Sequence, residues 1–291
     1  MSAPPVDRRD FPDPFVLPHS GVYLAFATNA GATNVQVMSS PDLARWRGEA
    51  DALPAVAPWA VPGNTWAPAV LARDGSHVLY YTVREPRAGR QAISIAGSAH
   101  PAGPYLDQTT GPLVYQLDLG GSIDPSPFVD ADGTPYLLWK ADANAINQRS
   151  SLWIQRLTDA GTALVGEPVM LLEQDAEWEE PLIEAPSLVT QGGRYFLFYS
   201  ANWWNTSRYA IGYATAERAT GPYRKVTSSQ PWFASDAEVA GPGGQECFVD
   251  RSGRLRMAYH GWTPGRVGYP DGARSMRLAT INFFDGTPVA T

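Results

Sequence analysis

Three acidic residues occupy the same kind of short motif at widely separated points of the chain. Asp13 begins DPFV, Asp124 begins DPSPFV and Glu184 begins EAPSLV. Two carboxyl groups on either side of a glycosidic bond can hydrolyse it, because one protonates the leaving oxygen while the other activates water or attacks the sugar. A third carboxylate nearby helps to keep the acid protonated through like-charge repulsion. This chemistry requires that the three side chains meet in space.

The motif recurs at two further points, which makes five copies in 291 residues. The copies begin at residues 13, 66, 124, 184 and 245, between 53 and 61 residues apart. A small turn, an aromatic-rich segment and a third apolar segment follow each copy, as in 192–201 and 209–215. Short segments rich in Val, Ile, Tyr, Phe and Trp between Gly turns are typical of β-strands. The repeats predict an all-β fold, a five-bladed β-propeller with four antiparallel strands per blade.

The repeats begin about ten residues from the N-terminus and continue to the C-terminus, without a Pro/Ser-rich linker or a shift in composition. We therefore expect a single catalytic domain over residues 1–291. In a propeller the first strand of each blade lines the central channel, so the five motif starts should converge at one funnel. The residues at those starts are Asp13, Trp66, Asp124, Glu184 and the Gln245-Glu246 pair.

A structural interpretation of the acidic residues competes with the catalytic one. Asp-Pro at a strand entrance often serves only as a turn, because Asp bonds nearby backbone groups. For any one of Asp13, Asp124 and Glu184 the two interpretations are about equally good. Because all three acidic residues occur at equivalent repeat positions, the catalytic interpretation is favoured over the turn interpretation. Glu184 is the strongest case, since Glu is not a favoured turn former.

Composition excludes several other classes of protein. The net charge is −7, the pI is about 5.1 and no basic run occurs, which argues against nucleic-acid or anionic-membrane partners. No stretch approaches the roughly 20 apolar residues of a membrane span. Cys247 is the only cysteine, which excludes an internal disulfide. The opening MSAPPVDRRD lacks the apolar core of a signal peptide. We expect a monomer that is cytoplasmic, or secreted if a leader has been removed.

The motifs together resemble glycoside hydrolase family 43, and the resemblance runs from Asp10 to about Asp285. The matching segments are PDPF at 12–15, WAPAV at 66–70, GSIDPSPFVDADGTPYLLWK at 121–140, IEAPSLV at 183–189, FLFYSANWW and AYHGW. The resemblance implies a five-bladed propeller that acts on polysaccharides containing arabinose or xylose. It also implies separate roles for the acidic residues: Asp13 as general base, Asp124 as the group that tunes and orients the acid, and Glu184 as general acid. Hydrolysis would then invert the anomeric centre, with acid and base roughly 6.5–9.5 Å apart.

Further residues are assigned to substrate and metal. Trp66, Trp203, Trp204 and Glu246 are candidate substrate-binding residues near the funnel, although most of the ten tryptophans are expected to pack between blades. Arg274 resembles a family arginine that contacts the sugar, and an isolated Arg there would otherwise be a surface residue. Arg277 is out of phase with that match.

His260, in AYHGW, invites two interpretations. Taken alone it is a core histidine, whereas the resemblance implies a channel-facing histidine that binds a metal directly or through water. No cofactor is expected for the chemistry. Because no local His/Asp cluster supports tight binding, an ion near His260 is expected to be calcium or sodium with a structural role.

The substrate is the least defined part of the prediction. The chain lacks the C-terminal β-sandwich found on many β-xylosidases of the family, which favours an α-L-arabinofuranosidase. The bulky loops 178–183 and 201–208 are expected to block one end of a groove, so that the enzyme releases a terminal sugar from arabinan or arabinoxylan oligosaccharides. The alternatives are a β-xylosidase or a galactan-active exo-glycosidase, a non-catalytic sugar-binding propeller and a protein-interaction propeller.

Overall fold

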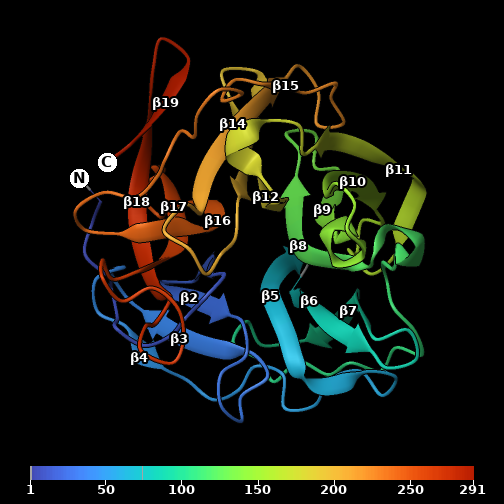
Figure 1. The fold of residues 1–291 in the computed structure, drawn as a ribbon. Helices are drawn as coiled ribbons and strands as arrows, with labels where there is room; N and C mark the ends of the chain where they lie inside the picture. The colour runs from blue at the N-terminus through green and yellow to red at the C-terminus, as the bar shows by residue number, and fades with distance from the viewer. Residues whose placement is uncertain (1, 74) are drawn as a thin grey trace.

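The computed structural model describes residues 2–73 and 75–291, which form five antiparallel sheets around a central channel (Figure 1). We name these sheets blades I to V in chain order. The prediction of an all-β, five-bladed propeller is confirmed.

Each blade is built from consecutive strands. Blade I contains β1 (Phe15–His19), β2 (Val22–Ala27), β3 (Gln36–Ser40) and β4 (Arg47–Gly48). Blade II contains β5 (Val61–Arg73), β6 (Ser76–Glu85) and β7 (Arg90–Ser98). Blade III contains β8 (Ser122–Val129), β9 (Pro135–Ala141), β10 (Ser151–Leu157) and β11 (Leu164–Glu173). Blade IV contains β12 (Ile183–Gln191), β13 (Arg194–Ala201), β14 (Ala210–Ala216) and β15 (Arg224–Lys225). Blade V contains β16 (Ala240–Val249), β17 (Leu255–Trp262), β18 (Ser275–Phe284) and β19 (Thr287–Ala290). In the described part of the chain, the connections carry three short 3₁₀ helices, η1 (Leu117–Leu119), η2 (Ala143–Ile146) and η3 (Glu177–Glu179).

Blade II has three regular strands where four were expected. Isolated bridges, Ile93 to Val114 and Gly97 to Leu106, lie where a fourth strand would pair with β7. This segment contains three prolines, at 101, 104 and 112, which lack the N–H group that a ladder needs. The fourth element of this blade is therefore reduced to local contacts.

The hydrophobic core is divided among the five interfaces between neighbouring blades. Successive side chains of a strand point to opposite faces, so each second strand serves two interfaces. In β6, for example, Tyr81 packs against blade I, whereas Tyr80 packs against blade III. Both tyrosines are fully buried. Aromatic residues on both faces explain why these strands are apolar nearly throughout.

Blades I and V meet where the chain ends come together (Figure 1). All four strands of blade V come from the C-terminal part, so side-chain packing closes the ring, with Val16 and Met38 of blade I against Met276 and Leu278 of blade V. The segment before β1 also joins this seam, because the Phe11 N–H donates to the Arg274 carbonyl at 3.0 Å. After this hydrogen bond the chain enters the channel, where Asp13 lies two residues further on.

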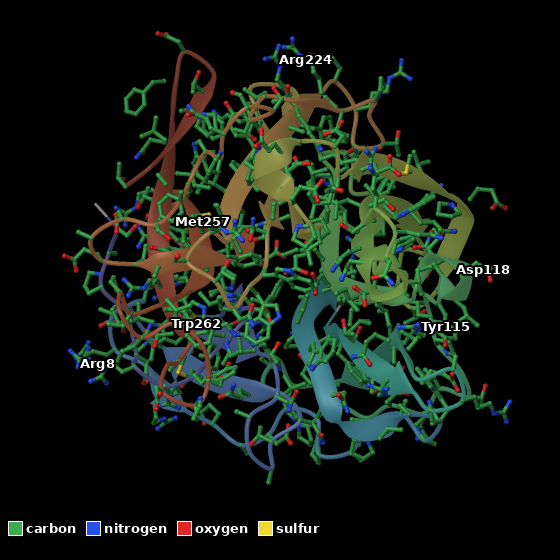
Figure 2. All side chains as sticks on the ribbon, viewed as in Figure 1. Arg8, Tyr115, Asp118, Arg224, Met257 and Trp262 are labelled. Carbon is green, nitrogen blue, oxygen red and sulfur yellow. The ribbon has the colours of Figure 1, made fainter. Side chains whose placement is uncertain are left out.

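Charged side chains such as Arg8 and Arg224 project from the outer rim, while Trp262 lies within blade V (Figure 2). Across the described residues, no helix combines the length and the apolar character needed to cross a membrane.

Candidate active site

The first strands of the blades share an unusual backbone conformation where they line the channel. At the same position of each repeat the residue has a positive φ: Asp13 (54°), Ala67 (43°), Asp124 (56°), Ala185 (50°) and Gly244 (56°). Four of the five are not glycine, and such residues rarely adopt the left-handed region unless their surroundings hold them there. The repeat therefore imposes the same turn on every blade at the level of the site.

The equivalence corrects one alignment made from the sequence. Glu184 is one residue before the left-handed Ala185, whereas Asp13 and Asp124 are the left-handed residues themselves. A left-handed residue and its predecessor point their side chains differently, so Glu184 is equivalent to Trp66 rather than to Asp124. The prolines mark this register, because Pro14, Pro68, Pro125 and Pro186 each follow a left-handed residue.

The backbone N–H of each left-handed residue donates a hydrogen bond to a side chain. In four cases that side chain lies at the end of the second strand of the preceding blade. The acceptors are His260 for Asp13 (3.0 Å), Thr28 for Ala67 (3.0 Å), Thr82 for Asp124 (3.1 Å) and Ser200 for Gly244 (2.9 Å). The β-registers identify the fifth position of this ring as Lys140, since Lys140 pairs with Ile123 as Thr82 pairs with Trp66. We call these five residues the ring positions.

Lys140 interrupts the pattern because an ammonium group has no lone pair to offer. The Ala185 N–H instead donates to Asp124 Oδ2 at 2.9 Å. Lys140 Nζ lies 3.0 Å from Glu184 Oε2 and 3.1 Å from Asp142 Oδ1, and its side chain is only 1% exposed. Burial alone lowers the pKa of an ammonium, but the charges of Glu184, Asp142 and Asp124 outweigh it and raise the pKa of Lys140. Blade III thus places a permanent cation beside the acidic residues.

Glu184 is held on both of its oxygens. Lys140 contacts Oε2, while the Tyr209 hydroxyl donates to Oε1 at 2.8 Å. Burial, together with the charge of Glu184, raises the pKa of Tyr209 well above its usual value, so the hydroxyl stays protonated and remains a donor. These two donors fix the direction of the carboxyl group.

The electrostatic surroundings of Asp124 favour its neutral form. Burial, reinforced by the charges of Glu184 and Asp13, raises its pKa well above the usual value, although Lys140 opposes the shift. The charge of the neighbouring Glu184 is one cause of this shift, so the site favours the neutral form of Asp124 beside Glu184. A paired carboxyl and carboxylate in one site is the state that acid catalysis requires.

Asp13 stands on the other side, toward blades I and V. Its Oδ2 accepts a hydrogen bond of 2.6 Å from Thr28, and Arg274 Nη1 lies 3.9 Å from the same oxygen. Arg274 is 9% exposed, and its guanidinium lies 4.3 Å from the centre of the Trp204 ring. Arg274 is therefore a buried wall of the site, whereas Arg277 points away and donates to the Ala3 carbonyl.

These groups line one pocket of about 320 Å³. Its walls are Asp13, Thr28, Trp66, Ile123, Asp124, Lys140, Asp142, Asn144, Leu182, Glu184, Trp203, Trp204 and Arg274. The Trp204 carbonyl accepts a 2.9 Å hydrogen bond from Trp262 of blade V, which is labelled in Figure 2. Trp178 belongs to the loop 178–183 but packs on Tyr199 inside blade IV, so that part of the loop does not reach the pocket.

Glu246 was expected to bind substrate, but its surroundings differ from that expectation. It lines a separate cavity of about 30 Å³ in the channel, which also touches Asp13 and Asp124. There it accepts a 2.7 Å hydrogen bond from Ser187, and burial raises its pKa to about 7. The β-strand places Glu246 two residues beyond Gly244, below the level of the pocket walls.

The surroundings of His260 argue against direct binding of the expected calcium or sodium ion by a ring nitrogen, whereas binding through water stays a prediction. Its Nδ1 accepts the Asp13 N–H, and burial, with Arg274 nearby, lowers its pKa well below the usual value. A neutral ring with an occupied Nδ1 carries its proton on Nε2, which makes Nε2 a donor and not a ligand. Within residues 2–73 and 75–291, no group of three or more His, Cys, Asp or Glu side chains is arranged to hold a metal.

Sequence reasoning missed four polar residues that line the pocket, Thr28, Lys140, Asp142 and Asn144, and it missed Tyr209, which contacts Glu184. One signal was available for Lys140, which ends the otherwise apolar run YLLWK at the place where other repeats have Thr, Ser or His. Nothing comparable marks Tyr209, whose contact with Glu184 depends on how β12 and the start of β14 pack.

Comparison with known proteins agrees with this architecture. The family described as "Glycosyl hydrolases family 43" matches residues 3–288. The chain is 26% identical over 261 residues to the β-D-galactofuranosidase xynD of Aspergillus niger, a match that covers 86% of this chain and 71% of that protein. It is 29% identical over 236 residues to α-L-arabinofuranosidase 43 of Humicola insolens, covering 77% of this chain but 47% of that protein. The crystal structure of a thermostable family-43 glycoside hydrolase superposes with a TM-score of 0.89 at 28% identity, covering 100% of this chain and 96% of the other.

A five-bladed propeller with acidic residues in one pocket thus defines the class of the protein as a glycosidase. The chain belongs to glycoside hydrolase family 43, whose enzymes are inverting glycosidases that need no cofactor for catalysis. The relatives differ in the activity that their names give, so the family does not determine the substrate.

Proposed function

We propose that the chain is an inverting, exo-acting α-L-arabinofuranosidase. The observation that carries this proposal is the enclosure of Asp13, Asp124 and Glu184 in one pocket with two buried cations, Lys140 and Arg274. Acidic residues that served only as turns would not need such counter-charges.

Asp13 acts as the general base in this proposal. The Thr28 hydroxyl and Arg274 hold its carboxylate on the blade I side of the pocket, where it accepts a proton from the attacking water. Water then attacks the anomeric carbon in a single displacement, and the configuration inverts.

Glu184 acts as the general acid and protonates the leaving oxygen. The proton comes from the pair that Glu184 forms with Asp124, whose neutral form is favoured by burial. Once the proton has left, the Lys140 ammonium at 3.0 Å and the Tyr209 hydroxyl at 2.8 Å stabilise the Glu184 carboxylate. These donors are in place before the reaction, so stabilisation requires no reorganisation of the site.

The choice of a terminal arabinofuranose rests on the walls of the pocket. Indole rings of Trp66, Trp203 and Trp204 surround the carboxyl groups and offer faces on which one sugar can stack. Two relatives, at 29% and 24% identity, are named as α-L-arabinofuranosidases, which supports the same activity here. A galactofuranosidase is the second candidate, because the match to the β-D-galactofuranosidase xynD covers 71% of that protein. A β-xylosidase is the third candidate.

A panel of aryl glycosides tests the proposal: α-L-arabinofuranoside, β-D-galactofuranoside and β-D-xyloside, with the product anomer followed by NMR. We expect turnover of the arabinofuranoside with inversion, and a loss of at least about 10³-fold in Glu184→Ala and Asp13→Ala while the circular dichroism of the fold persists. Near wild-type rates in both variants would contradict the assigned mechanism, and a retained anomeric configuration would overturn inversion.

A non-catalytic sugar-binding propeller is the alternative from another class. It predicts several equivalent shallow sites on different blades and no product. Calorimetric titration with arabino-oligosaccharides distinguishes the two, since the proposed enzyme has one site per chain and consumes its ligand.

A further inference from the structure

A second hollow adjoins the catalytic pocket on the side of blade III. Its volume is about 310 Å³, close to that of the pocket itself, and the two share Asn144 and Trp203 as walls. The other side chains that matter for its chemistry are Gln148, Arg149, Gln174 and Glu180. Neither the family assignment nor the proposed roles of the three acidic residues uses this hollow.

The walls of the hollow lead directly to Glu184. One wall follows β9, in which Lys140 contacts Glu184, and continues four residues further to Asn144 in η2. The other wall, Glu180 and Pro181, ends one residue short of β12, which begins one residue before Glu184. Asp13, in contrast, lies toward blades I and V. The hollow is therefore on the side of the proposed acid, where the leaving group of a glycoside must be.

The chemistry of the walls suits a neutral ligand with many hydroxyl groups. Amide side chains can both donate and accept, and Trp203 is 43% exposed, which leaves an indole face available for stacking. Arg149 forms no ion pair with any residue that the structure describes, but the Glu180 carboxylate lines the same hollow and balances its charge. A single balanced cation does not make an anion site, so a phosphorylated ligand fits less well than a sugar.

Two polar groups of the hollow are buried and have unused hydrogen-bonding capacity. Asn144 Oδ1 is inaccessible to solvent and has no partner among the described residues. Gln174 is 3% exposed, and its Nε2 donates to Glu180 at 3.0 Å, which orients its amide. The backbone of η2 is fixed by bonds from Ala145 to Asp142 and from Gln148 to Ala143, both 2.9 Å. A preformed polar site of this kind recognises a ligand without first having to become ordered.

We propose that this hollow binds the sugar on the leaving-group side of the scissile bond, and that it makes the enzyme prefer oligosaccharides to glycosides with a non-sugar leaving group. This inference rests on the proposed function and adds to it the site for the rest of the chain. Attack on a terminal sugar in the pocket then delivers the departing glycan into the amide-lined hollow.

The test compares two substrates in the double variant Gln148→Ala/Arg149→Ala, which leaves all pocket walls intact. An aryl α-L-arabinofuranoside has no sugar in the hollow, whereas α-1,5-linked arabinotriose does. We expect kcat/KM for arabinotriose to fall about tenfold, mainly through KM, and the aryl glycoside to change less than twofold. The matched control is Gln191→Ala/Arg194→Ala, in another polar hollow at the far end of β12, which should affect neither substrate.

Equal losses on both substrates, or no loss on either, would overturn the inference. To keep this result separate from a failure of the proposed function, binding of arabinotriose and xylotriose is also measured by calorimetry in Glu184→Gln, with and without the double change. A wild-type enzyme without turnover would refute the arabinofuranosidase assignment, while a tenfold loss of trisaccharide binding in the double variant would still support the hollow. Unchanged binding of both trisaccharides would refute the hollow.

Discussion

Thr82 of blade II and Lys140 of blade III occupy the same ring position, yet they make different contacts. Thr82 accepts the Asp124 N–H of the next blade and supports only the backbone. Lys140 leaves the corresponding N–H of Ala185 to Asp124, and it forms an ion pair with Glu184. At four ring positions the side chain is an acceptor that supports the backbone of the next blade. At the fifth, in blade III, a cation replaces the acceptor and contacts the site instead.

A second comparison shows what that cation does. Glu184 and Glu246 both face the channel, but only Glu184 has an ammonium partner. Glu246 has the Ser187 hydroxyl, and no cation among the described residues lies within ion-pair distance. Burial accordingly raises the pKa of Glu246 to about 7. Burial without a neighbouring cation is thus enough to raise the pKa of this carboxyl group.

The largest expected effect comes from giving blade III the residue that blades I and II have. In Lys140→Thr the new hydroxyl can accept the Ala185 N–H as Thr28 and Thr82 do for their neighbours, but the charge is lost. We expect kcat to fall on the order of 100-fold, because a preorganised charge that stabilises the transition state is removed. The pH profile of kcat should also move to higher pH, since Lys140 lowers the pKa of Asp124. Steady-state kinetics from pH 4 to 9 measures both.

Two variants distinguish charge from volume at this position. Lys140→Met keeps most of the length without the charge and should resemble Lys140→Thr in its pH profile, while Lys140→Arg should restore part of the activity. If Lys140→Met retained the wild-type rate and profile, Lys140 would serve only to fill space. Unfolding in urea accompanies the kinetics, because two carboxylates without their buried partner are expected to cost about 3–5 kcal/mol.

Glu246 provides the next test through the pH dependence of stability. Its folded-state pKa of about 7 lies above the ordinary 4.5, so the folded chain binds this proton more tightly than the unfolded chain. Its contribution to the free energy of unfolding is therefore present below pH 4.5 and is lost as the pH rises to 7. Glu246→Gln removes that dependence and keeps an acceptor for Ser187. We expect the variant to match the wild type near pH 4 and to exceed it by about 2–3 kcal/mol at pH 7.5.

Urea unfolding at the two pH values measures this difference, with hydrolysis of the aryl glycoside as the control. Activity should change less than twofold, because Glu246 lies outside the pocket walls. The same stability difference at both pH values would contradict the raised pKa.

The repeat explains why so much of the fold could be predicted from the sequence. Strand alternation and five spaced motifs are local patterns, and closure of a propeller then brings Asp13, Asp124 and Glu184 into one pocket. The register error at Glu184 arose because the acidic residues were aligned instead of the prolines: Pro186 follows Ala185, as Pro125 follows Asp124. A local pattern is enough to correct that error.

Contacts between blades could not be predicted in the same way. The ion pair of Lys140 with Glu184 joins β9 to β12, and the hydrogen bond from the Ala185 N–H to Asp124 joins β12 to β8. Such contacts depend on the twist and spacing of neighbouring sheets, which no single repeat encodes. The neutral state of His260 is a further case, since it follows from complete burial and from an N–H of the first blade.

The smallest effect is expected at Thr82, and it tests the scaffold side of the comparison. Thr82→Val preserves shape but leaves the Asp124 N–H without its acceptor at a position that is fully buried. An unpaired buried N–H should lower the free energy of unfolding by about 1–2 kcal/mol. Activity on the aryl glycoside should remain within about threefold, because Asp124 still accepts the Ala185 N–H of blade IV. A loss of activity as large as that of Lys140→Thr, with the fold intact, would mean that the acceptors shape the catalytic geometry as strongly as the cation does.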